Sequence, residues 1–215
     1  MHTEAISNSV WGLLQRLNEM PFITSCYLGG GTALALQLGH RMSDDLDLFL
    51  PQPSDQNALI RDIRNAGLDA IVLNQTQYHL ELAIDAVKVD MIQEQIPSMF
   101  PLKPVESQYH NLKMADPRDI GRMKIVSIGS RGSKKDFIDL YCLTREIISL
   151  ESLLKLTDEE KKGIRYSKVL FLKGLVDFEE ADREPELTMI WNISWEEVKR
   201  NLEKEVKQIA RRMEI

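Results

Sequence analysis

The chain contains little cysteine. Only Cys26 and Cys142 occur among its 215 residues, and their spacing is not that of a CxxC pair. Both lie in apolar surroundings, so we predict that they pack in the interior and take no part in metal or redox chemistry. Free thiols of this kind fit a reducing compartment, and we expect the protein in the cytoplasm.

Long apolar runs and an excess of positive charge are absent as well. No segment approaches the roughly 20 residues that a membrane-spanning helix needs, and the first residues lack the pattern of a secretory signal. We therefore expect no membrane partner. The 27 Lys and Arg residues are outnumbered by 33 Asp and Glu residues, which gives a net charge of −6. This balance argues against a generally basic nucleic-acid-binding surface, so an RNA partner would need a local basic groove.

The composition that is present is that of a globular protein. With 43% hydrophobic and 28% charged residues, the chain can bury a core in one domain or two small ones. We predict an α/β core over residues 1–100 and a helical C-terminal part over residues 101–215 that completes the active-site cleft. Three prolines between Pro97 and Pro104 mark the connector. The expected fold class is α+β, a mixed β-sheet with flanking helices followed by further helices.

Apolar periodicity and turn residues predict the individual elements. Ser54 is the expected cap of the helix that ends at Gly67, and Ser194 and Glu197 have the spacing of a capping box. Helices are predicted over residues 5–19, 32–38, 54–67, 117–128, 133–148, 157–162, 165–181 and 194–213, and strands over 23–28, 45–50, 70–73, 79–84 and 87–92.

The most informative stretch is a glycine-rich turn followed by a strand with two acids. Gly30 and Gly31 can bring backbone N–H groups close to a phosphate, since no Cβ stands in the way. The helix that starts at Thr32 adds a favourable partial charge at its N-terminus. Asp45 and Asp47 project from one strand face, where a divalent cation best relieves their repulsion. Either feature alone is commonly a tight turn or a solvated strand edge, but together they favour metal-assisted nucleotidyl transfer from a nucleoside triphosphate.

A third acid lies in the run Val87–Ile92. Asp90 shares one strand face with Lys88, and a lone acid among apolar strand residues costs free energy unless it is paired. We take Asp90 as the candidate third carboxylate of the metal site, with an ordinary edge-strand charge as the alternative. Asp85 is the competing acid, but its position before Ala86 suits a hairpin corner better.

Polar residues also precede the acid pair. The guanidinium of Arg41 and the hydroxyl of Ser43 can reach triphosphate oxygens. The alternatives are a salt bridge from Arg41 to Asp44 or Asp45 and a turn hydroxyl at Ser43, and we favour the phosphate contacts. His40 is equally compatible with a structural hydrogen bond.

A second group of charges lies further along the chain, at Lys124, Arg131, Lys135, Asp136 and Asp139. The first two are two helical turns apart and the others open the next helix, so a turn between the helices could make them converge. Convergent cations would neutralise charge on the transferring phosphate and on pyrophosphate. The alternative is a set of solvated surface charges, with an acid in the favourable first turn of its helix.

These motifs resemble a known family. The order of the glycine pair and the two acids, with residues 32–44 between them, resembles the DNA polymerase β-like nucleotidyltransferase superfamily. More narrowly, the run from Gly30 to Phe49 is similar to the AbiEii/AbiGii toxin-type nucleotidyltransferase family of bacteria and archaea. Residues 87–92 resemble the strand that supplies the third acid. Residues 124–141 resemble the third motif, although Ser127 and Gly129 depart from its alanine-rich character.

The resemblance implies an Mg²⁺- or Mn²⁺-dependent nucleotidyltransferase with a nucleotidyltransferase-type sheet. Some members of the family are toxins that add nucleotides to the acceptor end of transfer RNA and are neutralised by a cognate antitoxin, so both partners are expected here. The implied metal ligands are Asp45, Asp47 and Asp90, and the other residues implied for activity are Lys124 and Asp136. The expected nucleotide-binding residues are Gly30, Gly31, Thr32, Arg41, Ser43, Lys124, Arg131 and Lys135.

Three other interpretations compete with this one. The same core could nucleotidylate a protein hydroxyl or a small molecule, and a degenerate copy could bind a nucleotide or partner without catalysis. A P-loop or dinucleotide-binding turn is disfavoured, because Gly-Lys-Ser/Thr and the full GxGxxG spacing are missing.

Overall fold

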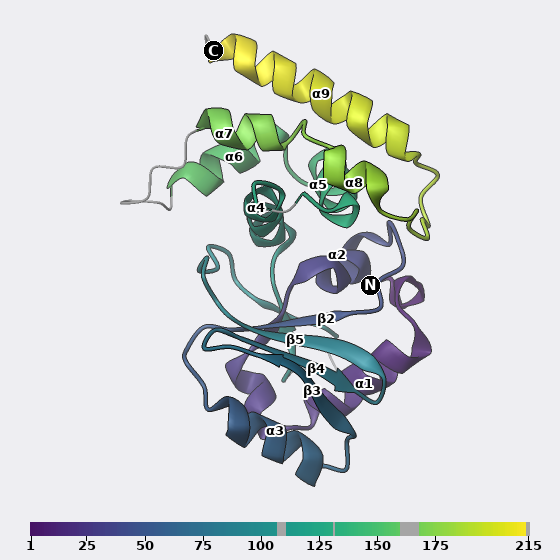
Figure 1. Cartoon of the computed structure of the whole chain (residues 1–215), viewed down its shortest axis with the longest axis vertical. Helices are drawn as coiled ribbons and strands as arrows, with labels where there is room; N and C mark the ends of the chain where they lie inside the picture. Colours follow the sequence, from purple (N-terminus) through teal and green to yellow (C-terminus); the bar gives the residue numbers. More distant parts are fainter. Residues whose placement is uncertain (107–110, 131, 160–167, 214–215) are drawn as a thin grey trace. The chain divides into compact units, whose positions relative to one another are not determined.

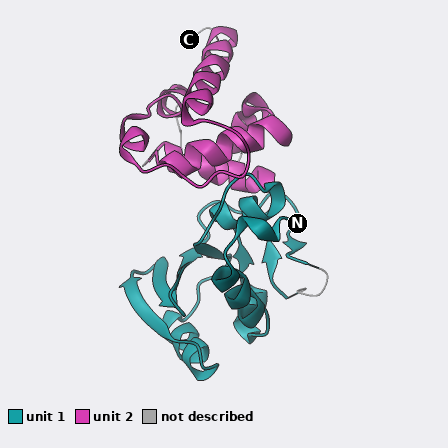
Figure 2. Ribbon diagram, turned by 90° about the vertical axis from the view of Figure 1, so that its right-hand side faces the viewer, with its two compact units in different colours: residues 1–116 teal, residues 117–215 magenta. Residues whose placement is uncertain are grey.

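The computed structural model describes residues 1–106, 111–130, 132–159 and 168–213. The chain divides into two compact units, Met1–Asp116 and Pro117–Ile215 (Figure 2). Residues 101–116, which the sequence analysis grouped with the helical part, lie in the first unit because two short strands there join its sheet.

The first unit is built around a mixed sheet, as predicted (Figure 1). Within the described residues the sheet has seven strands in the order β3-β4-β5-β2-β1-β7-β6. The pairs β2–β5 and β1–β7 are parallel and the other neighbours are antiparallel. The elements of this unit are η1 (Thr3–Ala5), α1 (Asn8–Asn18), η2 (Pro21–Ser25), β1 (Tyr27–Leu28), α2 (Gly30–Leu38), β2 (Leu46–Leu50), α3 (Gln56–Asn65), β3 (Ala70–Gln75), β4 (His79–Ile84), β5 (Val87–Gln93), β6 (Lys103–Pro104) and β7 (Lys113–Met114).

One face of this sheet forms the core of the first unit. Alternate residues of β2, β4 and β5 point to this face, and α1 and α3 pack against the sheet. Burial of each large aliphatic side chain contributes roughly 1.5–3 kcal/mol. The buried strand residues are Leu46, Leu48, Leu50, Leu80, Leu82, Ile84, Val87, Val89 and Met91. The residues between them necessarily point to the opposite face, which leaves the acids of β2 and β5 outside the core.

Several boundaries differ from the prediction for local reasons. Helix α1 begins at Asn8 because the Ser7 hydroxyl accepts the N–H of Val10, and Ile6 instead forms a parallel bridge to Ser43. The predicted strand 23–28 is a 3-10 helix, η2, followed by the two residues of β1.

The cap of α3 is also displaced by one residue from the predicted Ser54. The carboxylate of Asp55 accepts hydrogen bonds from the N–H groups of Asn57 and Ala58. Asp55, and not the hydroxyl of Ser54, therefore pairs the free N–H groups at the start of the helix.

The described residues of the second unit form helices, as predicted. These are α4 (Pro117–Ile128), α5 (Lys134–Glu146), α6 (Leu150–Glu159), α7 (Lys168–Gly174), α8 (Glu179–Arg183) and α9 (Trp195–Arg212). Helix α6 begins earlier than predicted, and the predicted helix 165–181 is divided into α7 and α8. The remainder of these two predictions, residues 160–167, lies outside the described residues.

Aromatic side chains join three helices of the second unit. Phe137 of α5, Phe178 before α8 and Trp195 of α9 lie with ring centroids 5.0–6.0 Å apart. Ser194 caps α9 by accepting the N–H of Glu197, as its spacing predicted. No helix in the described part of either unit is long and apolar enough to cross a membrane.

Candidate active site

The glycine turn and the acidic strand meet in the first unit. The N–H of Gly29 donates to the backbone oxygen of Asp47 at 2.9 Å, which ties the start of α2 to β2. Gly30 has a φ of +61°, and a Cβ added there would lie 1.8 Å from Oδ2 of Asp47. The Asp47 carboxylate therefore occupies the space that any residue larger than glycine would fill. Gly31 follows in the first turn of α2 and is buried.

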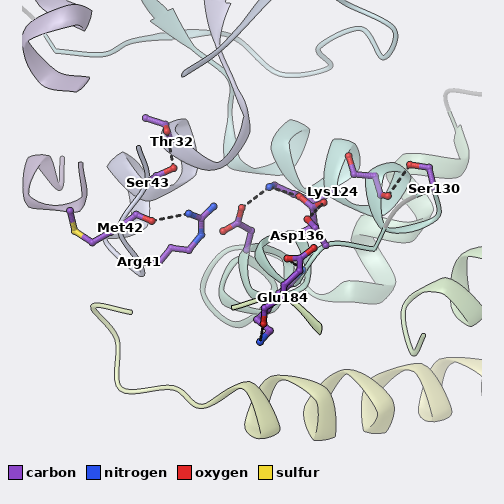
Figure 3. A network of polar contacts seen from close by, with 12 residues as sticks. Thr32, Arg41, Met42, Ser43, Lys124, Ser130, Asp136 and Glu184 are labelled. Atoms are coloured by element: carbon purple, nitrogen blue, oxygen red, sulfur yellow. Dashed lines mark hydrogen bonds and ion pairs between the residues drawn. The ribbon is translucent and has the colours of Figure 1, made fainter. Parts of the chain in front are cut away.

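Two buried hydroxyls hold the loop that leads into β2. The Thr32 hydroxyl shares a hydrogen bond of 2.8 Å with the Ser43 hydroxyl and also bonds to the backbone oxygen of Asp45 (Figure 3). Buried hydroxyls require such partners, and these two find them in each other and in the backbone. Thr32 and Ser43, predicted as phosphate contacts, thus lie in an internal network that places Asp45 next to the first turn of α2.

Arg41 belongs to the same loop. Its side chain is buried, and its Nη1 donates to the backbone oxygen of Met42 at 2.8 Å (Figure 3). His40 beside it is also buried. This loop is therefore built from polar side chains that are held by the protein itself.

Asp90 lies directly beside Asp47 in the sheet. The two residues are register partners in the parallel pair β2–β5, so both side chains point to the same face from strands about 4.8 Å apart. The side chain of Asp90 is 11% exposed. Asp85, the competing acid, occupies the β4–β5 turn with a φ of +48°, where it binds Arg16 at 2.7 Å.

Sequence reasoning placed Lys88 on the same strand face as Asp90 but named neither Lys88 nor His79 as its partner. His79 Nε2 lies 2.5 Å from Asp90 Oδ1, and Lys88 Nζ lies 3.3 Å from Oδ2 and 3.1 Å from Oε1 of Glu81. Burial lowers the pKa of Lys88, but the bond to Glu81 and the charge of Asp90 outweigh it and hold that pKa above its usual value. The hairpin was the signal in the sequence that could have revealed these partners. A two-residue turn at 85–86 places residue 81 opposite residue 90, and residue 79 then lies diagonally across from residue 90 on the same face.

The donor chemistry of these acids suits a hard divalent cation. Asp45, Asp47 and Asp90 offer carboxylate oxygens, the ligands that Mg²⁺ prefers. A carboxylate has about four lone-pair sites, so Asp90 can accept from His79 and Lys88 and still offer one to a cation. Among the residues that the structure describes, no three His, Cys, Asp or Glu side chains already converge on one metal position.

A second cluster lies within the second unit. Lys124 Nζ of α4 lies 2.8 Å from Oδ1 of Asp136 and 2.6 Å from Oδ2 of Asp139, both on α5 (Figure 3). All three side chains are buried, and the Ser133 hydroxyl donates to Asp136 at 2.7 Å. The predicted convergence of Lys124 with the two acids is therefore present, and it takes the form of a buried ion-pair network.

The other cations of the second group differ in environment. Lys135 lies half-buried in the first turn of α5, and Arg131 lies outside the described residues. Lys134, which the prediction passed over, is buried and donates to the backbone oxygen of Glu184 at 2.7 Å and to Glu186 at 2.9 Å. It anchors the start of α5 to the segment after α8.

Comparison with known proteins supplies independent findings. The model of a family described as "Nucleotidyl transferase AbiEii toxin, Type IV TA system" matches residues 12–213. An uncharacterized protein of Aquifex aeolicus (strain VF5) is 32% identical over 200 residues, covering 91% of this chain and 93% of that protein.

Solved structures share the fold. A candidate nucleotidyltransferase from H. pylori gives a TM-score of 0.59 at 18% identity and covers 97% of both chains. MenT4, a nucleotidyltransferase toxin from Mycobacterium tuberculosis H37Rv, gives a TM-score of 0.59 at 14% identity, covering 94% of this chain and 86% of that one.

Proposed function

Because the chain belongs to the AbiEii nucleotidyl transferase toxin family, we propose that it transfers a nucleoside monophosphate from a nucleoside triphosphate to an acceptor hydroxyl. The observation that carries this proposal is the carboxylate of Asp47, which lies against Gly30 and beside Asp90. A glycine turn, a helix N-terminus and neighbouring acids thus meet within one unit. Such a combination suits a triphosphate and its cation, because a helix N-terminus favours anions and carboxylate oxygens favour Mg²⁺.

The proposed metal ligands are Asp45, Asp47 and Asp90, with Mg²⁺ or Mn²⁺ as the cation. When bound, the cation would neutralise phosphate oxygens as a Lewis acid. The backbone N–H groups of Gly30 and Gly31 would bind the leaving phosphates, assisted by the partial charge at the start of α2. The acceptor hydroxyl, beside Asp90, would attack the α-phosphate in line, and pyrophosphate would leave as the new ester forms.

The remaining predicted residues have supporting roles in this proposal. Arg41, Arg131 and Lys135 are proposed to contact the triphosphate. Thr32 and Ser43 are proposed to act through the loop that they hold, since their hydroxyls bond to each other. Lys124 and Asp136 are proposed to be required for activity, and both belong to the buried network that Lys124 forms with Asp136 and Asp139.

The proposed acceptor is the acceptor end of transfer RNA, with a cognate antitoxin as the protein partner and the cytoplasm as the place of action. The family's description as a toxin of a type IV toxin-antitoxin system supports the search for these partners. A protein hydroxyl and a small molecule are the alternative acceptors.

The test is incubation of the purified chain with Mg²⁺, each of four α-labelled nucleoside triphosphates and total transfer RNA. The double variant Asp45→Ala/Asp47→Ala removes the acid before β2 and the acid within it, and Asp44→Ala is the matched control because Asp44 is exposed and outside the proposed set. We expect label in RNA with the parent and with Asp44→Ala, and none with the double variant or with a chelator.

Two other results would change the proposal. Label that enters protein or small molecules but not RNA would replace the acceptor and keep the reaction. Equal labelling by the parent and the double variant would refute the assignment of Asp45 and Asp47.

A further inference from the structure

Both carboxylate oxygens of Asp90 are engaged by side chains of the same sheet face. His79 reaches Oδ1 from β4 at 2.5 Å, and Lys88 reaches Oδ2 from two residues earlier on β5 at 3.3 Å. The carboxylate is thus held from two directions, by His79, which lies outside the sequence motifs, and by Lys88, which lies within the run 87–92.

We propose that His79 is a positioning residue for Asp90. Its Nε2–H fixes the carboxylate in the orientation that the transfer reaction uses. This inference rests on the proposed function, in which Asp90 binds the cation beside the acceptor hydroxyl. Hydrogen-bond partners of this kind hold metal-binding carboxylates in place, and their loss typically costs about 10–100-fold in metal affinity or activity.

The backbone around His79 favours this role. The N–H of His79 donates to the Thr76 hydroxyl at 3.1 Å, and its carbonyl oxygen accepts the N–H of Thr76 at 2.8 Å. The residue is therefore anchored on both sides at the start of β4. An imidazole has only two side-chain torsions, so an anchored backbone leaves the ring little freedom to move away from Asp90.

Lys88 is less suited to set the orientation. Its ammonium lies closer to Glu81, at 3.1 Å, than to Asp90, and its side chain is 43% exposed. The side chain of Lys88 is long and flexible, and its charge is shared between Glu81 and Asp90. Lys88 therefore compensates the charge of Asp90 without defining the plane of its carboxylate. Positioning by His79 and charge compensation by Lys88 are therefore separable by mutation.

The experiment measures Mn²⁺ affinity directly, by calorimetric titration of the protein with and without α,β-methylene nucleoside triphosphates, which cannot react. His79→Leu removes the donor at similar size, and His79→Gln retains an amide N–H. Tyr78→Leu is the matched control, because it removes an exposed ring from the adjacent position. Each variant is also tested in the Asp90→Ala background, and kcat and KM for transfer are measured separately.

We expect His79→Leu to weaken Mn²⁺ binding by about 10–100-fold and to lower kcat more than it raises KM. His79→Gln should restore most of the affinity, and Tyr78→Leu should match the parent. In the Asp90→Ala background His79→Leu should have no further effect, since it acts only through that carboxylate.

Parental Mn²⁺ affinity in both His79 variants, with weaker binding in Asp90→Ala, would overturn the inference and leave the proposed function standing. An equal loss with and without Asp90 would also overturn it. If the parent bound no Mn²⁺, or bound it as well as Asp45→Ala/Asp47→Ala does, the proposed function itself would fail. If His79→Leu did not fold, His79→Ala, which also lacks the donor, would take its place in the same comparison with His79→Gln.

Discussion

Replacement of Gly30 by alanine tests the central contact of the proposed site. Gly30 has a φ of +61°, and its added Cβ would lie 1.8 Å from Oδ2, 2.6 Å from Cγ and 2.9 Å from Cβ of Asp47. Ordinary carbon contacts are about 3.5–4.0 Å. Because the Cβ of Asp47 is itself too close, rotation of the carboxylate alone does not relieve the clash. The turn or the strand must shift.

Two effects determine how much stability and activity Gly30→Ala should lose. The left-handed backbone costs alanine about 1–2 kcal/mol relative to glycine. The displacement adds to this cost, and a shift of about 1 Å in a reacting group can lower the rate roughly 100-fold. We therefore expect Gly30→Ala to lose more than about 1–2 kcal/mol of unfolding free energy and to lose transfer activity by about 100-fold or more.

Gly67→Ala provides the matched control. Gly67 has a φ of +73°, but nothing lies within 4 Å of its added Cβ. It should show the backbone cost alone, with parental activity. The assays are urea unfolding and labelling of transfer RNA at saturating nucleotide. Equal losses of stability in the two variants, with activity kept in Gly30→Ala, would refute this reasoning. The position of the Asp47 carboxylate would then not depend on the absence of a Cβ at Gly30.

Three further outcomes are expected. Thr32→Val removes the buried hydroxyl that bonds to the Asp45 backbone and should cost about 1–3 kcal/mol in urea unfolding; an unchanged midpoint would contradict it. Burial raises the pKa of Cys26 to about 12, so its thiol should react with a disulfide reagent at pH 8 only when urea unfolds the protein. Burial raises the pKa of Glu205, partly opposed by Lys204. Its stabilising contribution is then present below the unfolded pKa and lost as pH rises through the folded pKa. Glu205→Gln should therefore raise Tm at pH 7 and leave it unchanged at pH 3, and no gain at pH 7 would contradict this sign.

The sheet could be predicted where local signals sufficed. The alternation in β4 and β5 and the corner at Asp85 are properties of a short segment, so sequence periodicity located them. The prediction was wrong further along the chain. The predicted helix 165–181 is divided, with α7 ending at Gly174 and α8 beginning at Glu179.

The candidate site, too, could be predicted only where its residues form a local pattern in the sequence. Its acids could be found because an Asp-x-Asp pair after a glycine turn is a linear pattern. His79 could not be found as a partner of Asp90 from one strand, because it faces Asp90 only through the register of β4 on β5. Likewise, the role of Thr32 depends on a loop that returns to its helix 11–13 residues later. The resemblance implied a nucleotide contact at Thr32, and the structure adds the internal partners of its buried hydroxyl.

The acids of the two clusters differ in how deeply they are buried. Asp90 and Asp136 are almost wholly buried and lie against His79 and Lys124, respectively. A buried carboxylate without a counter-charge costs several kcal/mol, so these pairs let the chain fold with its acids already oriented. Asp47, by contrast, is half-buried, so the β2 side of the acid face is more accessible to solvent than Asp90 is. The proposed cation should therefore enter from the β2 side of the acid face, toward an Asp90 that the fold has already aligned.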